Sequence, residues 1–266
     1  MFRYAICNET FQDWPFESAF AFARECGYTG IEIAPQTLTE DAPTLRKMMR
    51  DCGLTFVGLH SLLSEPVGLH ITAVDAAVRR RSWERLARLV DVCSSLGSRG
   101  VMVLGSGKQR AAWSGGSSVE EATKRLEEGL ATLAPIAHAR GVTVLLEPLA
   151  PQLSDVITTL GDAVSMVRRI NSAGLSSMFD THNTAGERDP APVLIERYFR
   201  YIRHAHVNEM DGRYPGSGNY DFASVLHTLR HLGYAHWMSV EVFDFSAGGD
   251  VIARESMRTL QSAGER

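Results

Sequence analysis

One theme recurs along the chain: an amphipathic helical segment, then a glycine, then a short apolar run. In the first example Phe16, Phe20 and Ala23 have helical spacing, and Gly27 precedes the run Ile31 to Ala34. Apolar residues three and four positions apart are typical of a helix, and a glycine just past a helix is a common left-handed stop. The apolar runs are nearly continuous, which is typical of parallel strands that are covered on both faces.

The theme predicts eight strands in the 266 residues, with a final helix over Ile252 to Gln261. The expected strands are Phe2 to Cys7, Ile31 to Ala34, Leu54 to His60, Val101 to Leu104, Val142 to Glu147, Leu175 to Asp180, Ile202 to Val207 and Trp237 to Val242. Eight βα units in about 250 residues indicate an α/β protein with a (β/α)8 TIM barrel. No linker interrupts the pattern, so we expect residues 1–266 to form a single domain, with Ser114 to Ser118 as a flexible loop.

The rival architecture is an open, doubly wound sheet. Such a sheet is expected to carry a glycine-rich phosphate loop after an early strand, and the chain has no such loop. Gly105-Ser-Gly-Lys108 follows the fourth expected strand, but it lacks the spacing of a Walker motif. The barrel is therefore the favoured fold.

Composition limits the possible partners. Lys and Arg number 27 and Asp and Glu 31, a net charge of −4, whereas nucleic-acid-binding proteins normally show a basic footprint. No stretch approaches the length of a membrane span, and the N-terminus runs into a strand without a secretory signal. We therefore expect a cytoplasmic protein with no nucleic-acid partner and no membrane partner. The four cysteines form no C-x-x-C pair and are expected to be reduced.

Four ionisable residues stand at the ends of four successive apolar runs: Glu147, Asp180, His206 and Glu241. In a TIM barrel these strand ends meet at one rim, where active sites lie. A buried carboxylate costs several kcal/mol unless it is paired, hydrogen-bonded or coordinated. Three oxygens and one nitrogen suit Mn²⁺, Mg²⁺ or Co²⁺, and such an ion keeps positions open for substrate. Taken singly, each residue has an alternative reading as a salt-bridge partner or a hydrogen-bonded core residue.

The residues around these positions resemble a known family. The matching segments are Leu-Glu147-Pro, Phe-Asp180-Thr-His, His204-Ala-His206 with the later Pro215-Gly-Ser-Gly218, and Ser239-Val-Glu241. They are similar to the xylose-isomerase-like TIM barrels, and within them to the sugar phosphate isomerase/epimerase group that includes the ketose 3-epimerases. The resemblance implies that the four residues bind one divalent cation, with Mn²⁺ as first choice and Co²⁺, Mg²⁺ or Zn²⁺ as alternatives.

The same resemblance implies a reaction. A divalent ion polarises a sugar carbonyl and stabilises the enediolate that forms when a carboxylate removes the neighbouring proton. Glu147 and Glu241 would be the acid/base pair, and Arg213, ahead of the Pro-Gly-x-Gly stretch, would hold substrate oxygens. The expected partner is a small carbohydrate, phosphorylated or not, and homo-oligomers are common in the group.

Five other residues are candidate substrate contacts. The epimerases carry a histidine three residues after the metal-binding aspartate, where this chain has Asn183, with His182 one position earlier. His60 ends the third expected strand and either contacts substrate or supports a ligand by a hydrogen bond. Glu32, on the second strand, either binds a hydroxyl or pairs with Arg or Lys. Lys108 either binds a phosphate or carboxylate or is a solvated loop cation.

Three other functions compete with the isomerase. A dehydratase or lyase of the inosose dehydratase kind would use the same barrel to expel a hydroxyl from a cyclitol or keto-acid. An apurinic endonuclease would need further histidines, notably one after the fourth strand, where the chain has Leu104-Gly105. The acidic net charge also disfavours DNA binding. A binding protein on a decayed barrel would not need four intact ligands.

Overall fold

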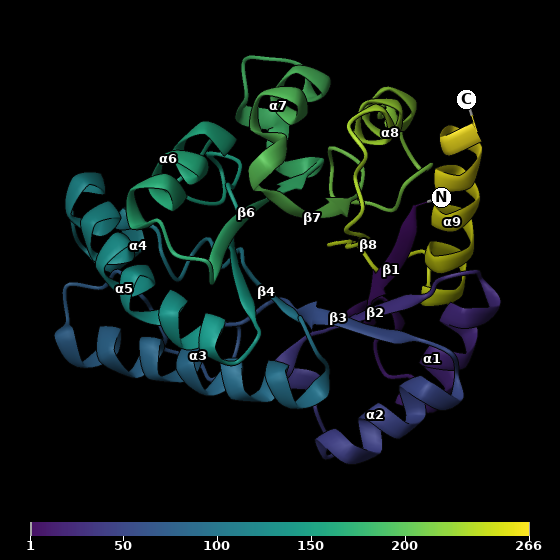
Figure 1. The fold of residues 1–266 in the computed structure, drawn as a ribbon, viewed down its shortest axis with the longest axis horizontal. Coiled ribbons are helices and arrows are strands. Elements are labelled where there is room, and N and C mark those ends of the chain that lie inside the picture. The colour runs from purple at the N-terminus through teal and green to yellow at the C-terminus, as the bar shows by residue number, and fades with distance from the viewer. Residues whose placement is uncertain (1, 266) are drawn as a thin grey trace.

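A computed structural model describes residues 2–265 of the chain. Eight parallel strands form a closed barrel in sequence order, with β8 paired to β1, and Figure 1 shows the helices as a ring around it. The strands are β1 (Arg3–Cys7), β2 (Gly30–Ile33), β3 (Thr55–Leu59), β4 (Val101–Leu104), β5 (Thr143–Leu146), β6 (Leu175–Asp180), β7 (Ile202–Val207) and β8 (Trp237–Val240). The predicted TIM barrel is confirmed.

The strands alternate with helices, and a short extra turn comes before or after several of these helices. The helices are α1 (Phe16–Glu25), α2 (Ala42–Asp51), α3 (Ala76–Leu96), α4 (Ala112–Gly115), α5 (Val119–Ala139), α6 (Leu160–Ile170), α7 (Ala191–Tyr198), α8 (Phe222–His231) and α9 (Gly249–Glu265). Four 3-10 turns are η1 (Asn8–Phe11), η2 (Pro35–Thr37), η3 (His182–Gly186) and η4 (Phe199–Tyr201). In Figure 1 the helices follow one another clockwise. Since βαβ connections are right-handed, the view is onto the amino-terminal ends of the strands.

Local sequence explains where the helices begin and end. Ser118 and Glu121 form a capping box at the start of α5, and Asp75 accepts two backbone N–H groups at the start of α3. Gly141 follows α5 with φ +70°, a left-handed conformation that favours glycine. The segment expected to be a loop at Ser114 to Ser118 instead contains the end of α4 and the cap of α5.

Two apolar layers hold the barrel. The large layer lies between strands and helices and includes side chains such as Leu126 and Leu130 of α5. A much smaller cluster of Val103, Leu145 and Met178 comes from three neighbouring strands. Charged and polar side chains are also fully buried on the strands, which is unusual unless they are paired or bind a ligand. None of the helices in residues 2–265 is long and apolar enough to cross a membrane.

Candidate active site

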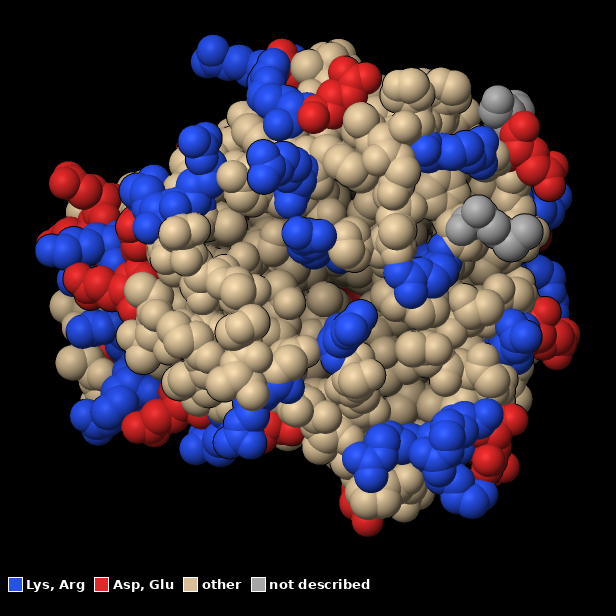
Figure 2. Space-filling model, viewed as in Figure 1, with Lys and Arg blue, Asp and Glu red and all other residues tan. Residues whose placement is uncertain are grey.

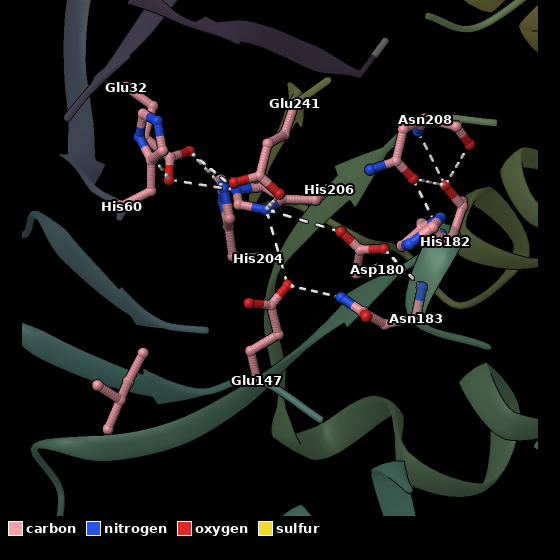
Figure 3. A network of polar contacts seen from close by, with 12 residues as sticks. Glu32, His60, Glu147, Asp180, His182, Asn183, His204, His206, Asn208 and Glu241 are labelled. Atoms are coloured by element: carbon pink, nitrogen blue, oxygen red, sulfur yellow. Dashed lines mark hydrogen bonds and ion pairs between the residues drawn. The ribbon is translucent and has the colours of Figure 1, made fainter. Parts of the chain in front are cut away.

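The structure brings the four predicted ligands together at the carboxyl ends of β5 to β8 (Figure 3). Glu147 directly follows β5, Asp180 ends β6, His206 lies in β7 and Glu241 directly follows β8. His206 Nδ1 is 2.9 Å from Glu241 Oε2, 3.8 Å from Asp180 Oδ2 and 3.9 Å from Glu147 Oε1. One ligand atom from each residue lies within 4.8 Å of all the others. One cation can therefore contact all four side chains.

The chemistry of this cluster fits a divalent cation. Asp180 Oδ2 is buried without a hydrogen-bond partner, and it points into the cluster, as does His206 Nδ1. Burial, and then the charges of Asp180 and Glu241, raise the pKa of Glu147 well above its usual range. Burial and Glu241 likewise raise the pKa of Asp180 to about 6. The charged forms of Glu147 and Asp180 are thus disfavoured in this cluster, and a divalent ion would remove that penalty.

Glu32 lies behind His206 and fixes its orientation. Glu32 Oε1 is 3.2 Å from His206 Nε2, and Glu32 Oε2 is 2.9 Å from His204 Nε2. Burial opposes the charge of Glu32, but the two histidines outweigh it and hold its pKa well below the usual range. The contact with Nε2 leaves His206 Nδ1 free to face the cluster, as carboxylate–histidine–metal arrangements require. The sequence predicted a substrate hydroxyl or an Arg or Lys side chain as the partner of Glu32, and the structure gives it His204 and His206 instead.

His60 also belongs to the buried network rather than to an open surface. Its side chain is fully buried, with Nε2 2.8 Å from Glu9 Oε2 and Nδ1 3.8 Å from Glu32 Oε1. Of the two roles considered from the sequence, these contacts favour support of the site by hydrogen bonding. Glu9 was not singled out from the sequence. It also accepts hydrogen bonds from Gln36 and Ser61, so it joins η1, η2 and the residues after β3.

Asn183 connects two of the predicted ligands. Its backbone N–H donates to Asp180 Oδ1 over 2.9 Å, and its side-chain Nδ2 donates to Glu147 Oε1 over 3.3 Å. Its Oδ1 accepts the backbone N–H of Ala150 over 3.1 Å. The amide therefore sets the direction of the Glu147 carboxylate. A histidine in this position would offer a single ring N–H donor at a different distance from the backbone. The difference from the epimerase pattern at Asn183 therefore directly affects Glu147, an expected acid/base residue.

A cavity of about 370 Å³ opens above the cluster, and its volume suits a small sugar. Glu147, Asn183 and Glu241 line it together with residues of the loops after β3, β4, β5 and β8. Lys108, from the loop after β4, is exposed and also lines the cavity. Gly105 lies so close to the site that a Cβ placed there would be 1.7 Å from Glu147 Oε2. No larger residue fits at this position unless Glu147 moves.

Arg213 and His182, like His60 and Glu32, lie outside this lining. The exposed Arg213 guanidinium pairs with Asp211, with Nε 2.7 Å from Oδ2. His182 Nδ1 is 2.8 Å from the carbonyl oxygen of Met210, and its ring lies 5.5 Å from that of Phe243. Because Phe243 lines the cavity, His182 is one side chain removed from it. The nearby Pro215-Gly-Ser-Gly218 segment is fixed by Glu209, which accepts the backbone N–H of Gly216 over 2.9 Å and that of Tyr220 over 3.0 Å.

Arg110, which was not singled out from the sequence, is the largest fully buried side chain of the described residues. Its guanidinium donates to four backbone carbonyls, including that of Glu147 over 2.7 Å and that of Leu104 over 3.0 Å. The others belong to Val156 and Ile157. Nothing in the sequence distinguishes this arginine from a solvated loop cation. It ties the ends of β4 and β5 to the loop that precedes α6.

Comparisons with known proteins agree with the barrel fold. A family model described as xylose isomerase-like TIM barrel matches residues 20–263. An L-ribulose 3-epimerase of Mesorhizobium japonicum is 28% identical over 85% of this chain and 75% of its own length. A fructoselysine 3-epimerase of Shigella flexneri is 23% identical over 87% of this chain and 86% of its own length. A solved 3-keto-D-glucoside 4-epimerase from E. coli has a TM-score of 0.87 at 19% identity, covering 98% of this chain and 100% of that one.

Proposed function

Because this chain belongs to the xylose isomerase-like TIM barrel family, we propose that it is a divalent-metal-dependent sugar isomerase or epimerase. One observation carries the proposal. Glu147 and Glu241 both belong to the cation-binding cluster and both line the cavity. Each can therefore face the reacting carbon of a bound sugar. The matched relatives are named as epimerases of ketoses or related sugars, which supports the same reaction class.

The two glutamates would move the proton. A bound cation would supply polarisation of the sugar carbonyl, which makes the hydrogen on the next carbon acidic enough to remove. One glutamate takes that hydrogen as a proton, and the other returns a proton to the opposite face of the same carbon. Asn183 holds the Glu147 carboxylate in position, and Glu32 holds the His206 ring. Both therefore act as positioning residues in this proposal.

The proposed substrate is a ketose or a keto-sugar. Among the described residues, Lys108 is the basic side chain that lines the cavity. It would therefore contact a phosphate or carboxylate group if the substrate carries one. Arg213 would contact substrate only after its guanidinium leaves Asp211. We also propose that Mn²⁺ is the preferred ion, that the protein works in the cytoplasm, and that it assembles as a homo-oligomer.

A substrate screen with matched variants tests this function. Ketoses and sugar acids would be incubated with the Mn²⁺- or Co²⁺-loaded enzyme, and the products identified by NMR and mass. We expect a product of unchanged mass, and loss of turnover in Glu147→Gln and in Glu241→Gln. Loss of water from the substrate would instead identify a dehydratase. Full turnover in both variants would show that the glutamates are not the acid/base pair.

A further inference from the structure

A second, larger hollow lies at the opposite end of the barrel from the cation cluster. Its volume is about 1190 Å³, and it is lined by residues that begin strands, among them Thr55, Val101 and Thr143. It therefore opens at the amino-terminal ends of the strands, the face that Figure 2 presents to the viewer. Lys and Arg side chains gather around the middle of this face, whereas Asp and Glu lie mostly at its edge.

Arginine dominates the charge of this hollow. Its lining contains Arg3, Arg99, Arg168, Arg200 and Arg203, and no Asp or Glu. None of the five forms an ion pair with a carboxylate of residues 2–265, whereas elsewhere on the surface Arg140, Arg169, Arg197, Arg213 and Arg254 each pair with one. The whole chain has a net charge of −4. The positive charge of the hollow is thus a local feature and not a consequence of overall composition.

Helix ends explain only part of this charge. Helices of a TIM barrel end at this face, and cations stabilise the negative ends of helix dipoles. Arg168 lies in the last turn of α6 and Arg200 in the last turn of η4. Arg3 belongs to β1 and Arg203 to β7, while Arg99 lies between α3 and β4. For Arg3 and Arg203, which lie on strands, a helix dipole supplies no reason to face the hollow.

The arginines also face few groups that could balance them. Arg203 Nη1 is 3.3 Å from His236 Nε2, and Arg3 lies over the Trp237 ring at 5.0 Å. Burial, and then Arg203 and Arg3, lower the pKa of His236 to about 4, so this neighbour accepts a hydrogen bond and adds no charge near neutral pH. Guanidinium groups so arranged repel one another, and an anion bound between them would remove the repulsion.

We propose that this arginine-lined hollow binds a small molecule that carries a diphosphate group. Arginine forks bind phosphate oxygens in pairs, and several forks around one concave site suit a ligand with more than one phosphate. The hollow is large enough for a nucleoside diphosphate. The proposal does not depend on the sugar chemistry at the other end of the barrel.

Calorimetry with three related probes tests the proposal. The metal-loaded protein would be titrated with ADP, AMP and adenosine, with excess Mg²⁺ in both solutions. We expect ADP to bind one to one, AMP more weakly, and adenosine not at all. Affinity should fall as salt is raised, because the contacts are ionic and exposed.

Matched double variants locate the site. Arg99→Gln with Arg203→Gln should weaken ADP binding by at least about tenfold, since each removes a charged hydrogen-bond donor. Arg80→Gln with Arg254→Gln changes the net charge equally outside the hollow and should leave the affinity unchanged. The proposal would be overturned if both double variants weakened ADP binding equally, or if adenosine bound as tightly as ADP. It would also be overturned if Lys108→Gln alone abolished ADP binding. So would the absence of ADP binding at low salt.

Discussion

Replacement of Arg110 by methionine tests how the scaffold holds the site. Methionine keeps much of the apolar stem but removes every donor to the four carbonyls. Three of them retain another donor: Glu147 N to Leu104 O, Leu149 N to Ile157 O, and Ser154 Oγ to Val156 O. The carbonyl of Glu147 keeps no other hydrogen bond among those of the described residues.

The size of the effect follows from these contacts. One buried carbonyl without a donor costs roughly 1–3 kcal/mol, and each of the other lost bonds contributes roughly 1 kcal/mol. The substitution also removes the cost of burying the guanidinium charge, and this gain offsets part of the summed loss of stability. That cost shows in the pKa of Arg110, which burial lowers to about 10. We therefore expect a loss of about 3 kcal/mol, which for a chain of this size lowers the melting temperature by roughly 6–12 °C.

Activity should fall as well, because Arg110 holds the backbone at Glu147. A shift of about 1 Å at an acid/base group can cost about 100-fold in rate, so kcat should drop more than KM rises. Calorimetric melting and steady-state kinetics on the Mn²⁺-loaded enzyme measure the two effects. Arg254→Met, at an exposed arginine paired with Glu25, is the control. The reasoning is refuted if Arg110→Met has the same melting temperature and kcat as the control. For Arg110→Lys we expect a melting temperature and a kcat between those of Arg110→Met and the control.

Three further predictions address single features. Gly105→Ala should lower kcat at least about tenfold with little change in fold, because its Cβ would displace the Glu147 carboxylate; unchanged kcat would contradict this. Glu32→Gln should weaken Mn²⁺ binding about 10–100-fold by calorimetry, since it loosens His206; an unchanged affinity would exclude that role. The lowered pKa of His236 means that its neutral form stabilises the fold above about pH 6.5 and that this stability is lost as pH falls towards about 4. Urea unfolding should show that the free energy of unfolding falls between about pH 6.5 and pH 4. In His236→Gln this fall should be smaller than in the unsubstituted protein by about 1–2 kcal/mol, a value that allows for the partial exposure of His236. An equal fall in both proteins would contradict the assignment.

The fold was predictable because its signals are local and repeated. Apolar runs between glycine-ended helices specify strands buried on both faces, and a βα unit repeated eight times closes in one way. The convergence of the four predicted ligands was predictable for the same reason, since Asp180 and His206 stand at the ends of such runs. Barrel geometry then supplies their convergence.

The supporting contacts were not predictable, because they join segments that are distant in the sequence. Arg110 contacts carbonyls up to 47 positions away, and His206 meets Glu32 across 174 positions. Neither partner follows from periodicity or from a motif. The guanidinium of Arg213 illustrates the converse: its place before the Pro-Gly-x-Gly stretch predicts a substrate contact, yet a carboxylate two residues away binds it in the structure.

Transfer of hydrogen from solvent to the reacting carbon tests the central claim most directly. The Mn²⁺-loaded enzyme would convert a ketose in D₂O, and NMR would count the deuterium at each carbon of the product. Proton removal and return by Glu147 and Glu241 predicts one deuterium, at the carbon whose configuration changes, and predicts that this exchange stops when the metal is removed with a chelator. A product that forms with its original hydrogen in place, or exchange that persists without metal, would contradict the account.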